Sequence, residues 1–217
     1  MTTTGTATLA FGPLTIEYDD RVLRPRPWVQ LQSRWAAELL DDADQGPVLE
    51  LCSGAGHIGL LVVELTGRRL VAVDLEPTAC HFTRSNAARA GLEHLVEVRQ
   101  GRLEEVVEDG EQFALVVADP PWVTSAEVGR FPEDPLLAID GGVDGLAVAR
   151  ACVDAATGHV AAGGSVLLQL GDDAQADEVL AWAAPRGWDD GGRRVGERGL
   201  VLRLTPVAQI DPADQVD

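Results

Sequence analysis

Four consecutive residues, Asp119-Pro120-Pro121-Trp122, place a carboxylate, two prolines and an aromatic ring directly after the apolar run 113–117. The prolines fix φ and lack backbone donors, so the segment ends a strand and leaves its carbonyls free for water or a ligand. A planar amide or amine fits this set, because Asp119 and the Pro120 carbonyl can accept its hydrogens while the Trp122 ring stacks on its face. The alternative is an ordinary strand followed by a proline turn, and the neighbouring motifs must decide.

A second group of residues has the spacing of a nucleotide-binding loop. Gly54-Ala55-Gly56-His57-Ile58-Gly59 follows an apolar run and opens a helical pattern. Asp74 ends the next apolar run, about 20 residues after Gly54, where an acid accepts hydrogen bonds from ribose hydroxyls. Glycines let the backbone approach a ligand, and a helix N-terminus favours negative charge. The pattern predicts a site for an adenosine-containing ligand, with binding residues Glu50, Cys52, Gly54, Gly56, Asp74, Leu75 and Asp119.

Three features favour S-adenosylmethionine over a nicotinamide cofactor. Glu50 stands directly before the loop, where a carboxylate would repel a pyrophosphate but could hold the ammonium of a methionine group. Two antiparallel strands close the expected sheet, which is not typical of a simple dehydrogenase domain. Asp119 falls at the carboxyl end of the fourth strand, beside the switch point where open α/β sheets bind ligands.

The rest of the chain supplies the elements that position these residues. Apolar runs alternate with helical patterns, which predicts an α/β fold with a mostly parallel sheet. The last two strands are joined by four residues, so they must be antiparallel. The expected strands cover residues 48–51, 70–73, 95–98, 113–117, 165–170, 193–195 and 200–204, and the expected helices cover 57–65, 78–90, 145–157 and 174–184.

We expect one Rossmann-like domain over residues 41–205, with a seven-stranded, mostly parallel sheet, an antiparallel closing strand and helices on both faces. Residues 1–40 precede it as a flap, with a hairpin at 8–18 and a helix at 28–40. Residues 206–217 are acidic and contain a proline, and we expect them to be disordered.

Composition excludes several classes of function. The 35 acidic and 17 basic residues give a net charge of −18, which makes a long nucleic-acid partner less favourable. Arg21, Arg24 and Arg26 could form a local basic patch, but we expect them on a solvated face. No apolar run is long enough to span a bilayer and the N-terminus lacks a leader pattern, so we expect a cytoplasmic protein without membrane contact.

Metal and thiol chemistry also lose their usual signatures. The three cysteines, Cys52, Cys80 and Cys152, show no C-x-x-C pairing, and the histidines do not cluster, so we expect reduced thiols and no metal site. His57 is expected in the first helical turn without a catalytic role.

The combined motifs resemble the HemK family of methyltransferases, which methylate the glutamine side-chain amide of peptide-chain release factors. The resemblance runs from about residue 21 to 204. It is carried by the stretch 48–56, Asp74, Asn86, Asp119-Pro120-Pro121-Trp122 and the segment Leu137-Ala138-Ile139-Asp140-Gly141-Gly142-Val143-Asp144-Gly145-Leu146. It implies a class I methyltransferase fold and a substrate loop at Asp140 to Gly142. Residues 22–27 look like the family's Pro-Arg-Pro segment near the substrate entrance. Asn86, which could face solvent on its helix, is given no role.

The chain departs from the family pattern at informative positions. Asp119 and Trp122 replace the family's asparagine and tyrosine, so position 119 keeps an acceptor but loses the amide donor. Cys52 replaces a glycine, and no acid follows the third strand at 100–102, so we expect main-chain groups to hold the adenine instead. The resemblance does not extend to the helical substrate-binding domain of the bacterial release-factor enzymes. Short single-domain relatives of the family often act with a separate partner protein, and we expect the same arrangement here.

The sequence therefore predicts transfer of a methyl group from S-adenosylmethionine to a planar nitrogen, with Asp119, Pro120, Pro121 and Trp122 as the catalytic residues. A protein glutamine side chain is the leading acceptor. If the protein is an enzyme, the alternative acceptor is the amine of a small metabolite or of a nucleobase. Methyltransferases that act on base amines also have an aspartate at the point of the motif that Asp119 occupies. A S-adenosylmethionine-binding partner protein without catalysis and a nicotinamide-dependent oxidoreductase are the other classes weighed.

Overall fold

A computed structural model describes residues 5–43 and 46–207 of the chain. Its main sheet has seven strands in the order β5-β4-β3-β6-β7-β9-β8, and a separate two-stranded hairpin pairs β1 with β2. Strands β3 to β7 pair in parallel, whereas β9 is antiparallel to both β7 and β8. The strands are β1 (Ala7–Phe11), β2 (Leu14–Tyr18), β3 (Val48–Leu51), β4 (Leu70–Asp74), β5 (Val96–Gln100), β6 (Phe113–Ala118), β7 (Val160–Leu170), β8 (Trp188–Val195) and β9 (Leu200–Pro206). The predicted Rossmann-like fold with an antiparallel closing strand is confirmed.

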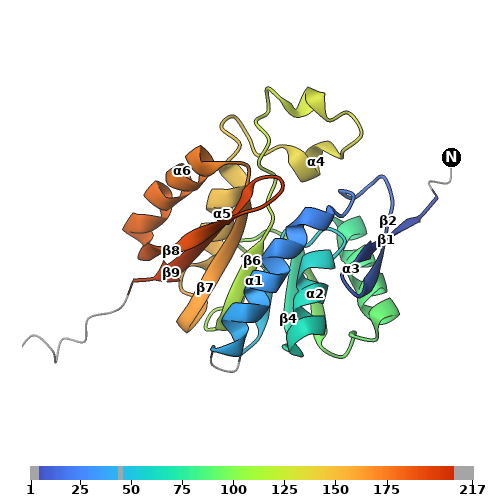
Figure 1. Cartoon of the computed structure of the whole chain (residues 1–217), viewed down its shortest axis with the longest axis horizontal. Coiled ribbons are helices and arrows are strands. Elements are labelled where there is room, and N and C mark those ends of the chain that lie inside the picture. Colours follow the sequence, from blue (N-terminus) through green and yellow to red (C-terminus); the bar gives the residue numbers. More distant parts are fainter. Residues whose placement is uncertain (1–4, 44–45, 208–217) are drawn as a thin grey trace, which may run out of the picture.

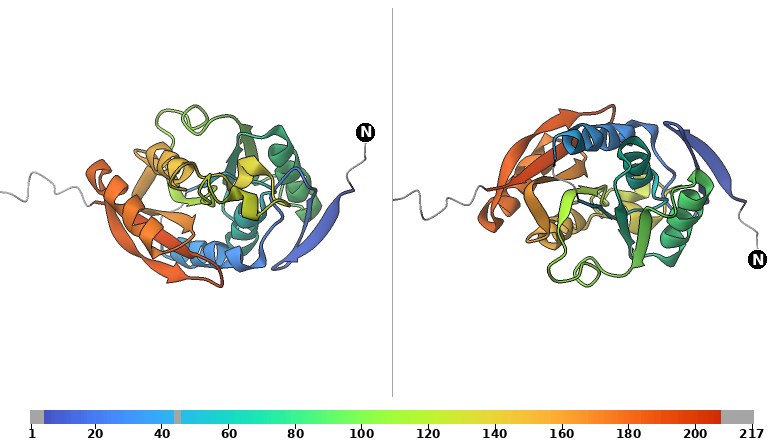
Figure 2. Two further views of the ribbon diagram at one scale, coloured as in Figure 1. Left: turned by 90° about the horizontal axis from the view of Figure 1, so that it is seen from above. Right: turned by 90° about the horizontal axis from the view of Figure 1, so that it is seen from below.

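Helices lie on both sides of this twisted sheet (Figures 1 and 2). They are α1 (Gln30–Asp41), α2 (His57–Thr66), α3 (Pro77–Ala90), α4 (Leu136–Ile139), α5 (Ala147–Ala156) and α6 (Asp173–Ala183). The segment that contains α4, yellow in Figure 1, lies over the end of the sheet where β6 leaves it. This is the edge at which the carboxyl ends of the parallel strands meet, so α4 is placed over the expected site.

The buried core divides into one layer on each face of the sheet. Successive side chains of a strand point to opposite faces, so Val48 packs with α1, α2 and α3 while Leu49 and Leu51 pack with α5 and α6. Strands β3 and β6 are buried along their whole length, as expected of central strands covered on both faces. The two layers hold the carboxyl ends of β3, β4 and β6 in fixed positions.

Two strands are longer than the sequence indicates, and glycine pairs explain why. We predicted strands from residues 165 and 193, each preceded by a glycine pair, whereas β7 starts at Val160 and β8 at Trp188. The register shifts between Phe113 and Leu115 against β7 and between Asp190 and Arg193 in β8. Gly163 and Gly192 have φ values of 75° and 99°. Each pair therefore forms a bulge inside a strand rather than a turn before it.

The hairpin at the N-terminal end is tied to the glycine loop, and this corrects our interpretation of Asn86. Its side chain is 1% exposed, not solvent-facing. Its Oδ1 accepts from the Glu17 backbone N–H at 2.8 Å, and its Nδ2 donates to the carbonyls of Glu17 and Ala55, both at 2.9 Å. Phe11 adds an edge-on contact with the His57 ring, with centroids 4.9 Å apart. Asn86 thus joins β2, α3 and the loop.

The structure can be compared with the predicted N-terminal flap and with the start of the predicted acidic tail. Helix α1 packs in the same core layer as α2, so the described part of the predicted flap, residues 5–40, shares its core with the main domain. Strand β9 runs to Pro206; most of the predicted acidic tail, residues 208–217, lies outside the described residues. Within the described part of the chain, no helix is long and apolar enough to cross a membrane, and no group of three or more histidine, cysteine or acidic side chains could hold a metal ion.

Candidate cofactor and acceptor site

A cavity of about 640 Å³ opens at the carboxyl ends of β3, β4 and β5. The glycine loop forms one wall, and α4 with the start of α5 forms another. Its lining is mostly apolar, with Asp74 and Asp119 among the polar groups. The lining includes Cys52, Ser53, Gly54, His57, Ile58, Asp74, Leu75, Glu76, Leu103, Glu104, Asp119, Leu136, Leu137 and Val148. Of the predicted cofactor residues, Cys52, Gly54, Asp74, Leu75 and Asp119 therefore meet at this cavity.

Asp74 fixes the shape of the glycine loop. Its Oδ2 accepts from the Gly54 backbone N–H at 2.8 Å, and its Oδ1 accepts from the Glu76 backbone N–H at 2.9 Å. Cys52, with φ of 59°, is a non-glycine residue in the left-handed region, where its family counterpart is glycine. Its Sγ lies 3.9 Å from that of Cys152, and all three cysteines are free thiols, as predicted. Gly56 does not line the cavity; it precedes α2 in the left-handed conformation.

Glu50 lies behind the loop rather than on the cavity wall. It is 2% exposed, its Oε1 accepts from the Gly59 backbone N–H at 2.8 Å, and its Oε2 has no partner among the described residues. A Cβ on Gly59 would lie 2.4 Å from that Oε2, so only glycine allows this approach. Burial raises the pKa of Glu50 to about 8. The geometry gives Glu50 a role in holding α2 against β3, whereas the sequence suggested direct contact with an ammonium group.

Glu50 should make folding stability depend on pH. Its folded-state pKa of about 8 lies above the ordinary value of 4.5, so the folded protein keeps a proton that the unfolded chain has lost. Stability from this group is therefore greatest below about pH 4.5 and falls as pH rises towards 8. We expect Glu50→Gln to raise the free energy of unfolding at pH 8 by on the order of 3 kcal/mol, with a smaller gain at pH 5. Urea unfolding at both pH values measures this, and an equal effect at both would contradict it.

A second cavity of about 430 Å³ adjoins the first on the other side of Asp119. The two cavities share Leu23, Asp119, Pro121 and Ala138 as lining residues. The second is lined by aromatic and charged side chains, namely Trp28, Trp122, Phe131, Arg26, Arg130, Glu133, Asp134 and Arg198, together with Pro120 and Gln169. All four predicted catalytic residues thus line this second space, and Asp119 stands at the junction of the two.

Asp119 has the properties of an unpaired hydrogen-bond acceptor. No described residue donates to its carboxylate, and burial raises its pKa to about 7. None of the hydrogen bonds within residues 5–43 and 46–207 uses the Pro120 carbonyl. A carboxylate and a carbonyl are therefore both available at the second cavity, as the proline pair indicated.

The loop after β6 is held by residues from three other elements. Gln32 on α1 is fully buried, and its Nε2 donates to the carbonyls of Ala118 and Leu167, both at 2.9 Å. Gln175 Nε2 donates to the Trp122 carbonyl at 2.9 Å. These bonds fix the backbone on each side of Asp119, so its carboxylate is presented from a rigid support.

The segment from Asp140 to Gly145 packs directly on this loop. The backbone of Val123 pairs with this segment through two hydrogen bonds. The Val123 N–H donates to the Ile139 carbonyl at 3.0 Å, and the Val123 carbonyl accepts from the Gly141 N–H at 2.8 Å. A Cβ on Gly141 would lie 2.7 Å from the Pro121 carbonyl oxygen, and one on Gly145 would lie 2.6 Å from that of Trp122. The glycines of this segment therefore permit its close packing against the loop 119–122.

Of the arginines near the entrance, Arg21 and Arg24 are exposed, as expected of a solvated face, whereas Arg26 is not. Arg26 lines the second cavity, and its Nη2 donates to both carboxylate oxygens of Asp134 at 2.7 Å. Arg21 pairs with Asp19, and Arg24 is exposed. Arg26 therefore links the N-terminal segment to the loop before α4 and helps to enclose the second cavity.

Comparisons with known proteins agree with this geometry. The family model "Methyltransferase small domain" matches residues 29–131. The release factor glutamine methyltransferase of Mycolicibacterium smegmatis is 34% identical over 193 residues, which cover 84% of this chain and 66% of that protein. The chain belongs with the HemK-like class I methyltransferases. The resemblance predicted from the motifs is thereby confirmed.

Two further similarities define its extent. The ribosomal protein uL3 glutamine methyltransferase of Bordetella pertussis is 31% identical over 162 residues, covering 71% of this chain and 54% of that protein. The crystal structure of a ribosomal protein L11 methylase from Lactobacillus delbrueckii subsp. bulgaricus shares the fold, with a TM-score of 0.64, 13% identity and coverage of 86% of this chain and 82% of that one. The HemK-like chain thus spans less than two thirds of the length of the two curated relatives named here.

Sequence reasoning missed several residues of this HemK-like site. Glu104 lines the first cavity, just beyond the positions 100–102 where we found no acid. Trp28, Gln169 and Arg198 line the second. Trp28 directly follows the Pro-Arg-Pro segment, which could have marked it, whereas Gln169 and Arg198 are brought in only by the order of β7, β9 and β8 in the sheet.

Proposed function

We propose that the chain transfers a methyl group from S-adenosylmethionine to a planar amide nitrogen, with a protein glutamine side chain as the acceptor. One observation carries this proposal: Asp119 stands between a largely apolar cavity that contains the glycine loop and Asp74, and a second cavity rich in aromatic side chains. Donor and acceptor can then approach each other from opposite sides of one carboxylate. The names of the curated relatives support a glutamine acceptor.

The residues of the first cavity fit S-adenosylmethionine. Asp74 would accept hydrogen bonds from the ribose hydroxyls, and the Gly54 backbone would lie against the ligand. Leu75, Leu103 and the α4 leucines would cover the adenine, with Glu104 close enough to take part. The bound cofactor supplies an electrophilic methyl group, so the protein must mainly align the acceptor and increase its nucleophilicity.

The acceptor loop would carry out that second task. Asp119 and the Pro120 carbonyl would accept the two N–H hydrogens of the amide, which favours charge development on nitrogen as it becomes tetrahedral. The Asp119 carboxylate would also take the proton that the nitrogen must lose once it is methylated. The aromatic side chains of the second cavity would hold the planar group and favour its growing positive charge. A cytoplasmic location and a partner protein remain predictions from the sequence.

The rate should rise with pH through the titration of Asp119. Burial raises the pKa of Asp119 to about 7. Only the ionised carboxylate offers both of its oxygens as hydrogen-bond acceptors, because the protonated form carries an O–H donor. We expect kcat/KM to increase between about pH 6 and 8 and to level off above that range. Initial rates across this range measure it, with Glu50→Gln as a control that should keep the same profile. A rate that is flat or that falls would contradict the role of Asp119.

The function itself is tested with methyl-labelled S-adenosylmethionine and a cell extract depleted of its own methyltransferases. Protease-sensitive label that acid hydrolysis releases as methylamine, and that complete protease digestion leaves on a glutamine side-chain amide, would support the proposal. Label in small molecules or in nucleic acid would favour the second candidate, a metabolite or nucleobase amine. That candidate rests on Asp119, which offers acceptors to an amine but no donor to an amide carbonyl. Tight cofactor binding without any labelled product would favour a non-catalytic partner protein.

A further inference from the structure

One of the three arginines that line the second cavity, Arg198, has no acidic partner among the described residues. Arg26 is paired with Asp134, and Arg130 is paired with Glu127 at 2.6 Å. Arg198 forms no ion pair with any residue in 5–43 or 46–207, although it follows Glu197. Arg198 is exposed, so its guanidinium, which has no carboxylate partner among the described residues, is available to a ligand that enters this cavity.

The position of Arg198 is set by a close approach of two backbones. It occupies the turn between β8 and β9, and a Cβ on the next residue, Gly199, would lie 2.2 Å from the Leu170 carbonyl oxygen. The Gly196 N–H donates to the Gly199 carbonyl at 3.0 Å, and Gln169 Nε2 approaches the Arg198 carbonyl at 3.4 Å. Only glycine allows this contact, so the fold brings the turn onto the carboxyl end of β7, beside Asp119.

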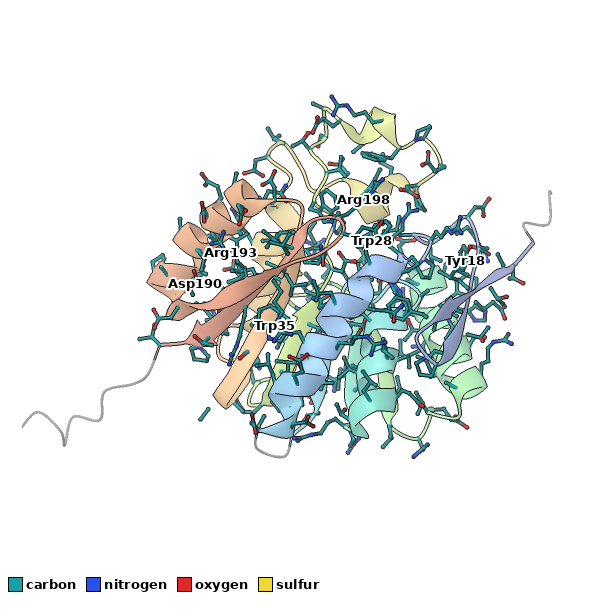
Figure 3. The ribbon with its side chains drawn as sticks, in the orientation of Figure 1. Tyr18, Trp28, Trp35, Asp190, Arg193 and Arg198 are labelled. Atoms are coloured by element: carbon teal, nitrogen blue, oxygen red, sulfur yellow. The ribbon has the colours of Figure 1, made fainter. Side chains whose placement is uncertain are left out.

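The side chain of Arg198 is held at the cavity by Trp28. The guanidinium carbon lies 5.5 Å from the centre of the Trp28 ring (Figure 3). The guanidinium carbon of Arg26 lies 5.7 Å from the centre of the same ring. A cation–π attraction to the ring favours this position of Arg198 and does not occupy its N–H donors. Arg198 and Trp28 both line the cavity that contains Asp119.

We propose that Arg198 and Trp28 form a subsite for a carboxylate that neighbours the methylated amide, so that the preferred acceptor is a glutamine flanked by an acidic residue. The inference rests on the proposed function for the identity of the acceptor amide. A carboxylate fits better than a phosphate, because Glu133 and Asp134 line the same cavity and the whole chain carries a charge of −18, which opposes a doubly charged group more strongly.

The test measures peptide binding, so it does not depend on methyl transfer. Acetylated and amidated peptides with a central glutamine, flanked by alanine, glutamate, lysine or phosphoserine, are titrated into the protein saturated with S-adenosylhomocysteine. We expect the glutamate-flanked peptide to bind about two- to fivefold more tightly than the alanine-flanked one, as befits an exposed ion pair. Arg198→Gln should remove this preference, and Arg198→Lys should restore part of it.

Arg194→Gln is the matched control. Arg194 lies on the same hairpin but away from the cavity, stacked on Trp35 at 4.5 Å and paired with Glu38 at 2.7 Å. This variant should keep the full preference for glutamate. All variants should bind S-adenosylhomocysteine as the unmodified protein does, since Arg198 does not line the cofactor cavity.

Three results would overturn the inference: no discrimination among the peptides by the unmodified protein, a preference that survives Arg198→Gln, or tighter Arg198-dependent binding of the phosphoserine peptide than of the glutamate peptide. Methyl transfer to the same peptides is then measured separately. Arg198-dependent binding without any methylation would contradict the proposed function while leaving the subsite in place.

Discussion

Replacing Asp119 with alanine is expected to lower kcat by about 10²- to 10³-fold, because the variant loses a preorganised acceptor at the reacting nitrogen. The dissociation constant of S-adenosylhomocysteine should change little, since Asp119 lines the first cavity only where that cavity adjoins the second one. Single-turnover methyl transfer and calorimetry measure the two effects separately. Undiminished turnover in Asp119→Ala would contradict the catalytic role.

Asp119→Asn separates the two classes of acceptor with one substitution. It restores the residue of the HemK pattern and supplies an N–H donor for an amide carbonyl. If the acceptor is glutamine, this variant should be about as active as the unmodified protein at pH 8 and lose the pH dependence between about 6 and 8. If the acceptor is an exocyclic amine, which has no adjacent carbonyl to bind that donor, Asp119→Asn should be clearly less active than the unmodified protein at pH 8, although its remaining Oδ1 acceptor should keep it more active than Asp119→Ala.

Replacing Asp74 with alanine should have the largest effect on cofactor binding. The change removes the acceptor of the Gly54 and Glu76 backbone N–H groups as well as the proposed ribose contact. Hydrogen bonds to charged groups contribute about 1.5–3 kcal/mol each, so we expect the dissociation constant of S-adenosylhomocysteine to rise by about 100-fold. Calorimetric titration of the variant provides the value.

Glu93→Gln controls for the loss of a negative charge, because Glu93 is exposed and lines neither cavity. It should bind S-adenosylhomocysteine normally. Unchanged affinity in Asp74→Ala would mean that the glycine loop keeps its shape without that carboxylate and that the ribose is bound elsewhere.

The sequence predicted the alternation of strands and helices well, because that pattern is written in local periodicity. Strand β6, helix α2 and the glycine loop between β3 and α2 lie close to their expected positions. The Gly163 and Gly191 pairs misled us, because adjacent glycines indicate a turn and a bulge equally well and only pairing with a neighbouring strand decides between them.

The candidate site was predictable where its residues follow strands. Asp74 and Asp119 each end a parallel strand, so their meeting at one edge follows from topology. Asn86 and Gln32 could not be found this way, because each is a polar residue on a helix whose partners are backbone carbonyls far along the chain. Glu50 showed the reverse error: its type and position suggested a ligand contact, whereas its bond to Gly59 turns it into the core.

The bonds from Asn86 to Glu17 and Ala55, with the Phe11 ring against His57, make the first hairpin and the glycine loop a single cooperative unit. Their amide protons should exchange with solvent together, through one shared opening event, and ligand binding to the loop should slow exchange in the hairpin as well. Every recognisable motif lies after residue 20, so an engineer seeking a minimal enzyme would be drawn to remove the hairpin. That trimming would remove the contacts that hold Asn86 and His57 in place beside the cofactor cavity.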